Sequence, residues 1–421
     1  MIDPARQILA LAAGDPDGAL AWLDGGDGRG WLGLEPDLSV EADSLAPLAE
    51  IEALWRAEPE FVWIGHLTYE VGVAALLGRP QPRGRLAGLC MRRYRAALEL
   101  GPSPRVHGSA GAGARLQARL AAAVPEDRPD QTWPLGPLRA RLPAEVYRAQ
   151  VRAAQALITA GETYQVNLTQ AFDAPWTDAG AGRSLAARAA AVYGAIRGTT
   201  PATMGALLVG AEGRGAPLWV LSNSPETLLA VEFAAGGDIA RSWPIKGTRP
   251  RGVDPRSDAA AAAELLASAK DLAEHVMIVD LVRNDLGRLA VPGTVEAPRR
   301  PTLVSLPTVH HLVSEVRCRL SPGWTLPGLL AAVFPAGSIT GAPKRRTAEI
   351  IAAIEDRPRG LYCGAIVVLA PHGLRCSIPI RTGELDANGL CVQSGGGIVI
   401  DSEPEAERLE TWAKVRAFDR R

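Results

Sequence analysis

The sequence has few lysines, few cysteines and no long apolar run. Only four of its 45 Lys and Arg residues are lysines, at positions 246, 270, 344 and 414. Arginine therefore serves wherever positive charge alone is needed, whereas a retained lysine can supply a neutral amine or a compact ammonium, which a guanidinium cannot. The alternative for each lysine is a leftover surface charge. Its sequence context has to decide between the two.

The five cysteines are scattered and form no C-x-x-C pair. An odd number of unclustered cysteines argues against a disulfide framework and against a zinc site, and it fits a reducing compartment. No run approaches the length of a membrane-spanning helix, and the opening MIDPARQILALAAG carries an acidic residue and too short an apolar stretch for a signal peptide. We therefore expect a cytoplasmic protein with no membrane contact.

Neither sign of charge dominates, because 46 acidic residues face 45 basic ones. This balance disfavours a nucleic-acid partner, which requires a basic surface, and it favours a small molecule or another protein. A chain of 421 residues with 47% hydrophobic residues can bury a sizeable core. It is long enough for two or three domains or for one large unit.

The chain divides by pattern into an N-terminal region, residues 1–115, and a region from 140 to 421 that holds the recognisable motifs. Residues 1 to about 100 favour short strands and turns, and the Gly- and Ser-rich stretch 101–116 predicts a surface loop. Later strand-like segments mostly follow one another across short turns, which indicates antiparallel sheets. Helical patterns cover residues 257–276, 344–355 and 403–418. The order of these elements predicts the α+β class.

The last helical segment follows the glycine run SGGGIVIDS, residues 394–402. Ser402 and Glu405 form an S-x-x-E capping pattern, and the helix then presents an acidic stripe that ends in Lys414. A glycine run lets the backbone approach a ligand closely and offer N–H groups to an anion. Glycines and helix therefore suggest one site, although a solvated helix face and a glycine bulge would explain each feature separately.

A second acidic pattern lies in the segment 257–290, where Asp271 and Glu274 are neighbours at i,i+3. Carboxylates from two such helices, with water, form the oxygen-rich environment that Mg²⁺ prefers, unless this helix is only amphipathic core packing. The loop FPAGSITGAPK precedes a helix and could receive an anion, but it lacks the order of a phosphate-binding P-loop. His311, among apolar neighbours, is either structural or part of a site.

Taken together and in this order, these segments resemble the chorismate-utilising enzyme family from about residue 140 to 418. The motifs that carry the resemblance are GETYQVNLTQ, SNSPET, PIKGTRPRG, AEHVMIVDLVRNDLGR, HHLVSEV, FPAGSITGAPK, YCGAIV, IRT and SGGGIVIDSEPEAERLETWAK. The first 100 residues resemble the family only loosely, through WIGHLTYEVG. The resemblance implies a large α+β unit in which two antiparallel sheets pack together, helices lie outside, and the active site lies between them.

Within the family, the segments are most similar to the large subunits of the aminodeoxychorismate synthase branch, because of Lys246 in PIKGT. The resemblance implies that this lysine attacks C2 of chorismate while the C4 hydroxyl departs, after which ammonia adds at C4 and expels the lysine. An arginine could not do this, because a guanidinium stays protonated. Anthranilate synthases usually have alanine there. The members that add water use a lysine where this sequence has Gln165, which cannot act as a general base.

The other roles are also carried over by resemblance. Glu226 of SNSPET would be the general acid that protonates the leaving hydroxyl, and His311 would lie near the ring. Magnesium would be the cofactor, with Glu274 and Glu410 as ligands and Asp271 and Glu407 bound to its water molecules. The residues expected to hold the substrate carboxylates are Tyr362, Arg381, Gly395, Gly397 and Lys414, with Thr248 and Ser338 as further members of the pocket.

The sequence shows no glutaminase signature, because no cysteine lies in a G-x-C-x-G turn. Ammonia is therefore expected from a separate glutamine amidotransferase subunit. The expected activity is the conversion of chorismate and ammonia to 4-amino-4-deoxychorismate, a precursor of para-aminobenzoate and folate. Two alternatives are the large component of an anthranilate synthase, which would also release pyruvate, and a paralogue that binds chorismate without turnover.

Overall fold

The computed structural model describes residues 4–14, 20–125, 133–177, 182–208, 218–306 and 309–419. Within these ranges the strands form three antiparallel sheets. The eleven-stranded sheet contains, in spatial order, β18 (Gly341–Ala342), β9 (Gln165–Pro175), β22 (Gly389–Ile398), β21 (Thr382–Asp386), β11 (Trp219–Ser224), β10 (Met204–Leu208), β1 (Ala21–Asp24), β2 (Gly30–Gly33), β6 (Ala96–Leu100) and β7 (Arg105–Gly108), with β8 (Arg139–Ala140) paired to β9.

The other two sheets are smaller. The eight-stranded sheet contains, in spatial order, β17 (Val316–Arg319), β13 (Ile239–Ser242), β12 (Thr227–Glu232), β20 (Gly373–Ser377), β19 (Ala365–Ala370), β4 (Val62–Leu67), β5 (Leu89–Tyr94) and β3 (Pro36–Ala42). The three-stranded sheet contains β14 (Ile245–Pro250), β16 (Val309–Val313) and β15 (Thr302–Ser305).

The two large sheets pack face to face, as the alternation of apolar residues requires. In β4, Val62 and Ile64 belong to the apolar cluster that joins the sheets, while Trp63 between them belongs to the core on the opposite face. In β10, Ala206 and Leu208 join the same cluster from the other sheet. Alternate residues of a strand point to opposite faces, so each strand contributes to two layers. The predicted α+β class with two packed antiparallel sheets is confirmed.

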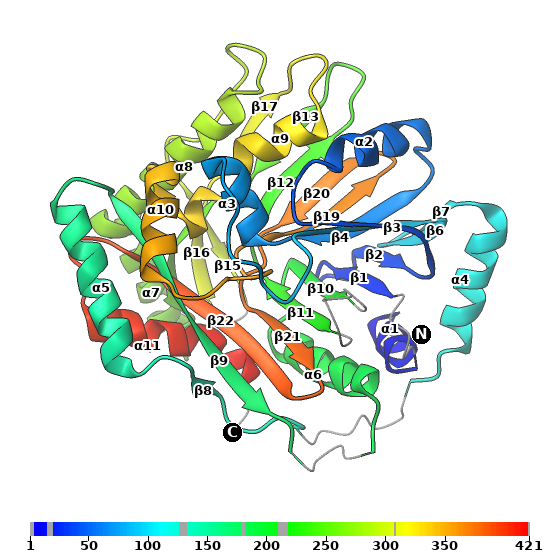
Figure 1. Ribbon diagram of the computed structural model, residues 1–421, viewed down its shortest axis with the longest axis horizontal. Coiled ribbons are helices and arrows are strands. Elements are labelled where there is room, and N and C mark those ends of the chain that lie inside the picture. Colours follow the sequence, from blue (N-terminus) through cyan, green and yellow to red (C-terminus); the bar gives the residue numbers. More distant parts are fainter. Residues whose placement is uncertain are drawn as a thin grey trace.

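Helices cover the outer faces of both sheets (Figure 1). The outer face of the eleven-stranded sheet carries α1 (Pro4–Ala13), α4 (Ala110–Ala122) and α6 (Leu185–Thr199). The core outside the eight-stranded sheet includes residues of α2 (Leu48–Ala57), α3 (Tyr69–Leu77), α8 (Ala269–Gly287), α9 (Leu326–Val333) and α10 (Lys344–Ile354). The remaining helices are α5 (Ala144–Thr159), α7 (Pro255–Ala267), α11 (Pro404–Val415) and the short 3₁₀ turns η1 (Gly337–Ile339) and η2 (Arg416–Phe418).

The N-terminal strands are divided between the two large sheets. Strands β1, β2, β6 and β7 belong to the eleven-stranded sheet, and β3, β4 and β5 to the eight-stranded one. The surface loop predicted over residues 101–116 is wrong, because β7 and the first half of α4 lie there. Arg105–Gly108 pairs with β6, and Leu116 is buried against the outer face of that sheet. Because the stretch is rich in glycine and serine, its sequence did not indicate the short strand and the alanine-rich helix.

Two helix boundaries also differ from the predictions. The helix predicted over residues 257–276 is two helices, because Ser268 between α7 and α8 is extended and its hydroxyl accepts a hydrogen bond from the Asp271 amide at 3.3 Å. In α11 the N-cap is Glu403 and not Ser402, since the Glu403 carboxylate accepts from the Ala406 amide at 2.6 Å. Ser402 instead donates to Glu407 at 2.6 Å.

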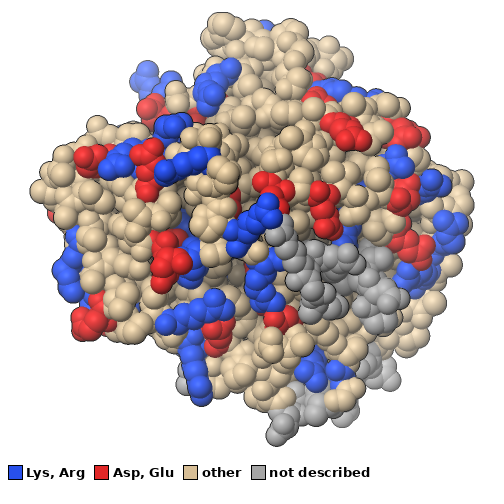
Figure 2. Space-filling model, in the orientation of Figure 1, with Lys and Arg blue, Asp and Glu red and all other residues tan. Residues whose placement is uncertain are grey.

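Surface charge is mixed in sign. On the face drawn in Figure 2, basic and acidic side chains are interspersed among uncharged surface. Among the helices that the structure describes, none combines the length and the apolar composition needed to cross a bilayer.

Candidate active site

The three-stranded sheet presents Lys246 through a β-bulge. Ile245 pairs with Val313 and Thr248 with His311, so β14 has one more residue than β16 between these pairs. The extra length falls at Lys246 and Gly247, and Gly247 has a φ of +90°, which favours glycine. A Cβ on Gly247 would lie 3.1 Å from Leu265 and from Leu312. A bulge of this kind redirects the adjacent side chain, here that of Lys246, away from the regular ladder.

Helix α8 contacts the backbone of the bulge. His275 contacts the Lys246 carbonyl through Nδ1 at 3.3 Å and the Ser314 hydroxyl through Nε2 at 2.8 Å. Because His275 is buried, desolvation lowers its pKa, so it stays neutral beside the lysine. Sequence reasoning missed His275 and Ser314. The available signal was a histidine directly after Glu274 in a helix already assigned to the site.

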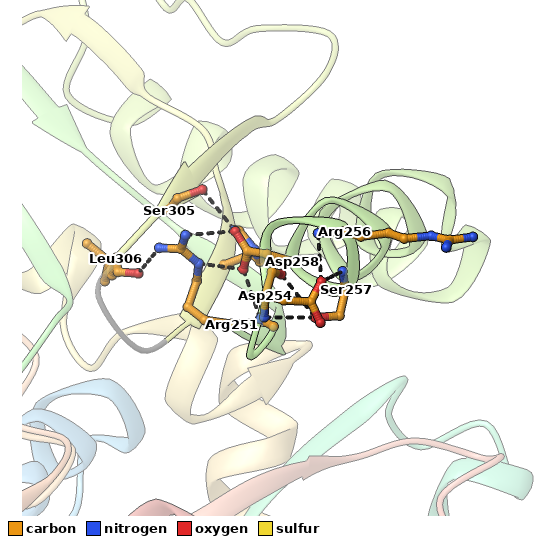
Figure 3. A network of polar contacts seen from close by, with 9 residues as sticks. Arg251, Asp254, Arg256, Ser257, Asp258, Ser305 and Leu306 are labelled. Carbon is orange, nitrogen blue, oxygen red and sulfur yellow. Dashed lines mark hydrogen bonds and ion pairs between the residues drawn. The ribbon is translucent and has the colours of Figure 1, made fainter.

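A polar network anchors the far end of the same strand (Figure 3). Asp258, in the first turn of α7, accepts two hydrogen bonds from Arg251 at 2.7 Å each and contacts His310 Nε2 at 2.9 Å. His310 Nδ1 reaches the Ser305 hydroxyl at 2.8 Å. The Arg251 hydrogen bonds hold the pKa of Asp258 well below its usual range. The network therefore ties β14, β15 and β16 to α7, which fixes the strand that carries Lys246.

Burial lowers the pKa of the Lys246 amine below its ordinary value. Loss of water lowers its pKa, and the charge of Lys414 lowers it further, while Glu274, Glu226 and Glu410 act in the opposite direction. An amine is a nucleophile only when it has lost its proton. The same interactions show that the carboxylates of three separate segments gather around this one lysine.

Glu226, directly before β12, is suited to donate a proton. The residue is 6% exposed, and burial raises the pKa of its carboxyl to about 7, although Ser338, Lys246, Lys414 and Arg381 all oppose the shift. Its Oε1 accepts a hydrogen bond from Ser338 in η1 at 2.9 Å. A carboxyl of this kind keeps its proton near neutral pH and can act as a general acid.

His311 faces the same region as a neutral ring. Its Nδ1 lies 2.8 Å from the Thr248 hydroxyl on the paired strand. Burial and the nearby charge of Arg381 lower its pKa to about 4. Its Nε2 is buried without a hydrogen-bond partner among the described residues. A buried polar atom without a partner is costly, so this nitrogen is available to a bound molecule.

Helix α11 and the glycine strand β22 form the opposite side of the site. Lys414 lies 2.7 Å from Glu410 and donates to the Gly395 carbonyl at 2.8 Å. Although loss of water opposes the change, Lys414, Lys246 and Lys270 lower the pKa of Glu410. Burial and the charge of Glu410 raise the pKa of Glu407. A Cβ on Gly396 would lie 2.8 Å from a Glu407 oxygen, so the glycine strand lies directly beside this carboxylate.

The carboxylates fit a magnesium site that substrate and water would complete. Among the described residues, no three His, Cys, Asp or Glu side chains converge tightly enough to hold a metal by themselves. Glu274 and Glu410 nevertheless both act on Lys246, from α8 and α11. Magnesium commonly uses one or two carboxylates and keeps several water molecules. The donor set is therefore compatible with Mg²⁺ bound by these two glutamates.

The other predicted residues have further partners. Asp271 lies beside Gly247 of the bulge, and its Oδ2 is paired with Arg249 at 3.0 Å, so its role in holding metal-bound water stays a prediction. Tyr362 is buried, and the charged groups that influence it are Cys363, Arg359, Glu355 and Tyr147, none of them among the site residues above. Gly397 lies against the Gln165 side chain, whose amide has no hydrogen-bond partner among the described residues.

Comparison with known proteins agrees with this geometry. A family model described as chorismate binding enzyme matches residues 19–420. Anthranilate synthase component 1 of Streptomyces coelicolor is 36% identical over 394 residues, which cover 92% of this chain and 71% of that protein. Aminodeoxychorismate synthase component 1 of Salmonella typhimurium is 42% identical over 270 residues, 64% of this chain and 56% of that protein. The matched segment thus spans little more than half of that second relative.

Solved structures show the same fold. Anthranilate synthase component I of Streptococcus pneumoniae TIGR4 superposes with a TM-score of 0.77 at 25% identity and covers 93% of this chain and 92% of that one. The menaquinone-specific isochorismate synthase of Escherichia coli gives 0.76 at 17% identity, over 97% of this chain and 90% of its own. From the family match along nearly its whole length and from the shared fold, the chain belongs to the chorismate-binding enzyme family.

Proposed function

We propose that this protein is the large component of an aminodeoxychorismate synthase, which converts chorismate and ammonia to 4-amino-4-deoxychorismate. The observation that carries the proposal is Lys246, a lysine with a lowered pKa on a bulge, which interacts electrostatically with Glu226, a carboxyl with a raised pKa. Neutral Lys246 attacks C2 while Glu226 protonates the departing C4 hydroxyl. Ammonia then adds at C4, and the C2–nitrogen bond breaks to return the lysine.

The other groups bind and orient the ring. Gly395, Arg381 and Lys414 would receive the substrate carboxylates, with Gly397 and Tyr362 as further expected contacts. Neutral His311, oriented by Thr248, would contact the ring. Gln165 leaves no general base to activate water at that position. Magnesium held by Glu274 and Glu410 would supply a clamp for the ring carboxylate.

The relatives support two activities, and the site favours one. Anthranilate synthases and aminodeoxychorismate synthases both match at 36–42% identity. The PIKGT segment, with its lysine, resembles that of the aminodeoxychorismate synthases and therefore favours that activity. A paralogue that binds chorismate without turnover would not need the lowered pKa of Lys246 and the raised pKa of Glu226. Relatives named component 1 also favour a partner subunit, which we propose to be a glutamine amidotransferase that supplies the ammonia.

The products formed from chorismate test the proposal directly. The purified protein, with Mg²⁺ and an ammonium salt, should give a product that an added aminodeoxychorismate lyase converts to para-aminobenzoate. Chromatography with and without the lyase separates the possibilities. Anthranilate and pyruvate formed without the lyase would assign the protein to the rival activity. Chorismate that binds in a titration but is not consumed would indicate the silent paralogue.

Magnesium dependence should follow the two glutamates. We expect Glu274→Gln and Glu410→Gln to weaken Mg²⁺ binding in the presence of chorismate by at least about tenfold, because each removes a charged oxygen ligand. Titration calorimetry and the Mg²⁺ dependence of turnover both measure this. Asp280→Asn is the control on α8, since the Asp280 side chain is 74% exposed. Equal Mg²⁺ affinity in all three variants would refute the ligand assignment.

A further inference from the structure

A small cavity lies behind Glu226, between η1, the end of β13 and helices α8 and α9. Its volume is about 20 Å³, which is room for one molecule of the size of water or ammonia. Most of its walls are apolar, formed by side chains such as Val282, Leu286 and Val333. The cavity is therefore of a size that suits one small molecule.

Two buried carboxyls line this cavity, and they differ in their partners. Glu226 and Asp285 are each 6% exposed. Asp285 lies 2.6 Å from Lys344, itself only 11% exposed at its side chain, so the ion pair neutralises this wall. Glu226 is hydrogen-bonded to the Ser338 hydroxyl, which also lines the cavity. A molecule in the cavity thus meets Glu226 as the group that exchanges protons.

We propose that this cavity is the position from which ammonia reaches C4, an inference that rests on the proposed function. The C4 hydroxyl departs toward Glu226, so a nucleophile for C4 has to arrive beside the same carboxyl. Apolar walls accept neutral ammonia and disfavour ammonium, because an unpaired charge is costly to bury. The cavity holds the nucleophile in its reactive form.

The proton balance fits this position. When the hydroxyl leaves as water, Glu226 has given up its proton and Lys246 is bound to C2 as a secondary ammonium. Ammonia forms the C4–nitrogen bond while the C2–nitrogen bond breaks, which restores the neutral lysine. The new C4 ammonium then gives one proton to the Glu226 carboxylate. Chorismate and ammonia have become aminodeoxychorismate and water, and both side chains are as they began.

Filling the cavity should slow only the ammonia step. In Val282→Phe we expect the KM for ammonia, measured with ammonium salts, to rise about tenfold or more, while the KM for chorismate stays unchanged. Val282 is the half-buried member of the lining on α8, so a larger ring can enter the cavity from there. Without ammonia, the covalent adduct at Lys246 should form at the wild-type rate, as intact mass measures.

Two further variants keep the test decisive. Val276→Phe makes the same change on the same helix, but Val276 is 59% exposed and does not line the cavity, so its kinetics should match wild type. Ala336→Val fills the cavity from the other side if Val282→Phe does not fold. Filled variants with a wild-type KM for ammonia would overturn the proposal, as would an equal loss of adduct formation, which would indicate general damage to the site.

Failure of the proposed function would look different. If the wild-type protein forms no aminated product at all, both the proposed function and the proposed ammonia site are wrong. If wild type aminates chorismate and the filled variants do so with unchanged dependence on ammonia, the proposed function stands and only the assignment of the cavity is wrong.

Discussion

Replacement of Lys246 by alanine should abolish amination of chorismate, with kcat reduced by about 10⁴-fold or more, as for the loss of other covalent nucleophiles. The amine is the group that forms the bond to C2, and the described structure offers no second lysine on the bulge. Lys246→Arg should be equally inactive although it keeps the positive charge, because a guanidinium does not lose its proton. The pair of variants therefore separates a nucleophile from a charge that only binds substrate.

Intact-mass measurement gives the second readout for this lysine. Wild-type protein incubated with chorismate and Mg²⁺ but without ammonia should gain the mass of chorismate less one water. Lys246→Ala should show no gain. An adduct that persists in the alanine variant would refute the assignment, and full activity in the arginine variant would assign to Lys246 a purely electrostatic role.

Glu226→Gln should also remove most of the activity, by about 10²–10⁴-fold, the usual contribution of a general acid. The pH dependence should change with it. The carboxyl must be protonated to act, and its pKa is about 7, so wild-type activity should fall as pH rises through that value. Lys246 attacks only after it loses its proton, and burial lowers its pKa, so a rising limb of the pH profile should follow the titration of this amine. Glu226→Gln should lack the falling limb near pH 7.

Substitution of Ser338 gives a second test of the falling limb of the pH profile. Its hydroxyl donates to the Glu226 carboxylate, which favours the charged form and lowers the pKa. Ser338→Ala should therefore raise the pKa of Glu226 and move the falling limb to higher pH while the activity persists. Steady-state rates over a pH series measure both variants. If Ser338→Ala and Glu226→Gln both keep the falling limb at the wild-type pH, a group other than Glu226 titrates there.

The sequence was most informative where a motif carries its own chemistry. Lys246 stood out by residue type and the acidic residues of α8 and α11 by spacing, whereas Glu226 and the role of each residue were implied by the family resemblance; the charges of Glu226, Glu274 and Glu410 all act on Lys246. The bulge at Gly247 was not predicted, because register depends on the partner strand β16, more than 60 residues further along the chain. The role of Asp271 in holding metal-bound water was implied by the family resemblance, which could not reveal its ion pair with Arg249.

Predictions from the local sequence pattern were wrong where amino-acid composition or a capping motif suggested a different structure. The stretch 101–116 has the glycine and serine content of a loop, yet pairing with β6 and an apolar contact through Leu116 give it a strand and a helix. Tertiary contacts outweighed propensity there, as they commonly do for short segments. Similarly, Ser402 satisfied the capping pattern, but its hydroxyl serves Glu407, and Glu403 caps the helix.

The division of the N-terminal strands between both sheets has a consequence for synthesis on the ribosome. Leu67 of β4 pairs with Ala365 of β19, a separation of roughly 300 residues, which takes on the order of 15–60 s to translate at 5–20 residues per second. Until then β4 lacks one neighbour, and its apolar residues stay accessible to chaperones or to other nascent chains. The newly made chain therefore needs protection for far longer than its individual hairpins take to form.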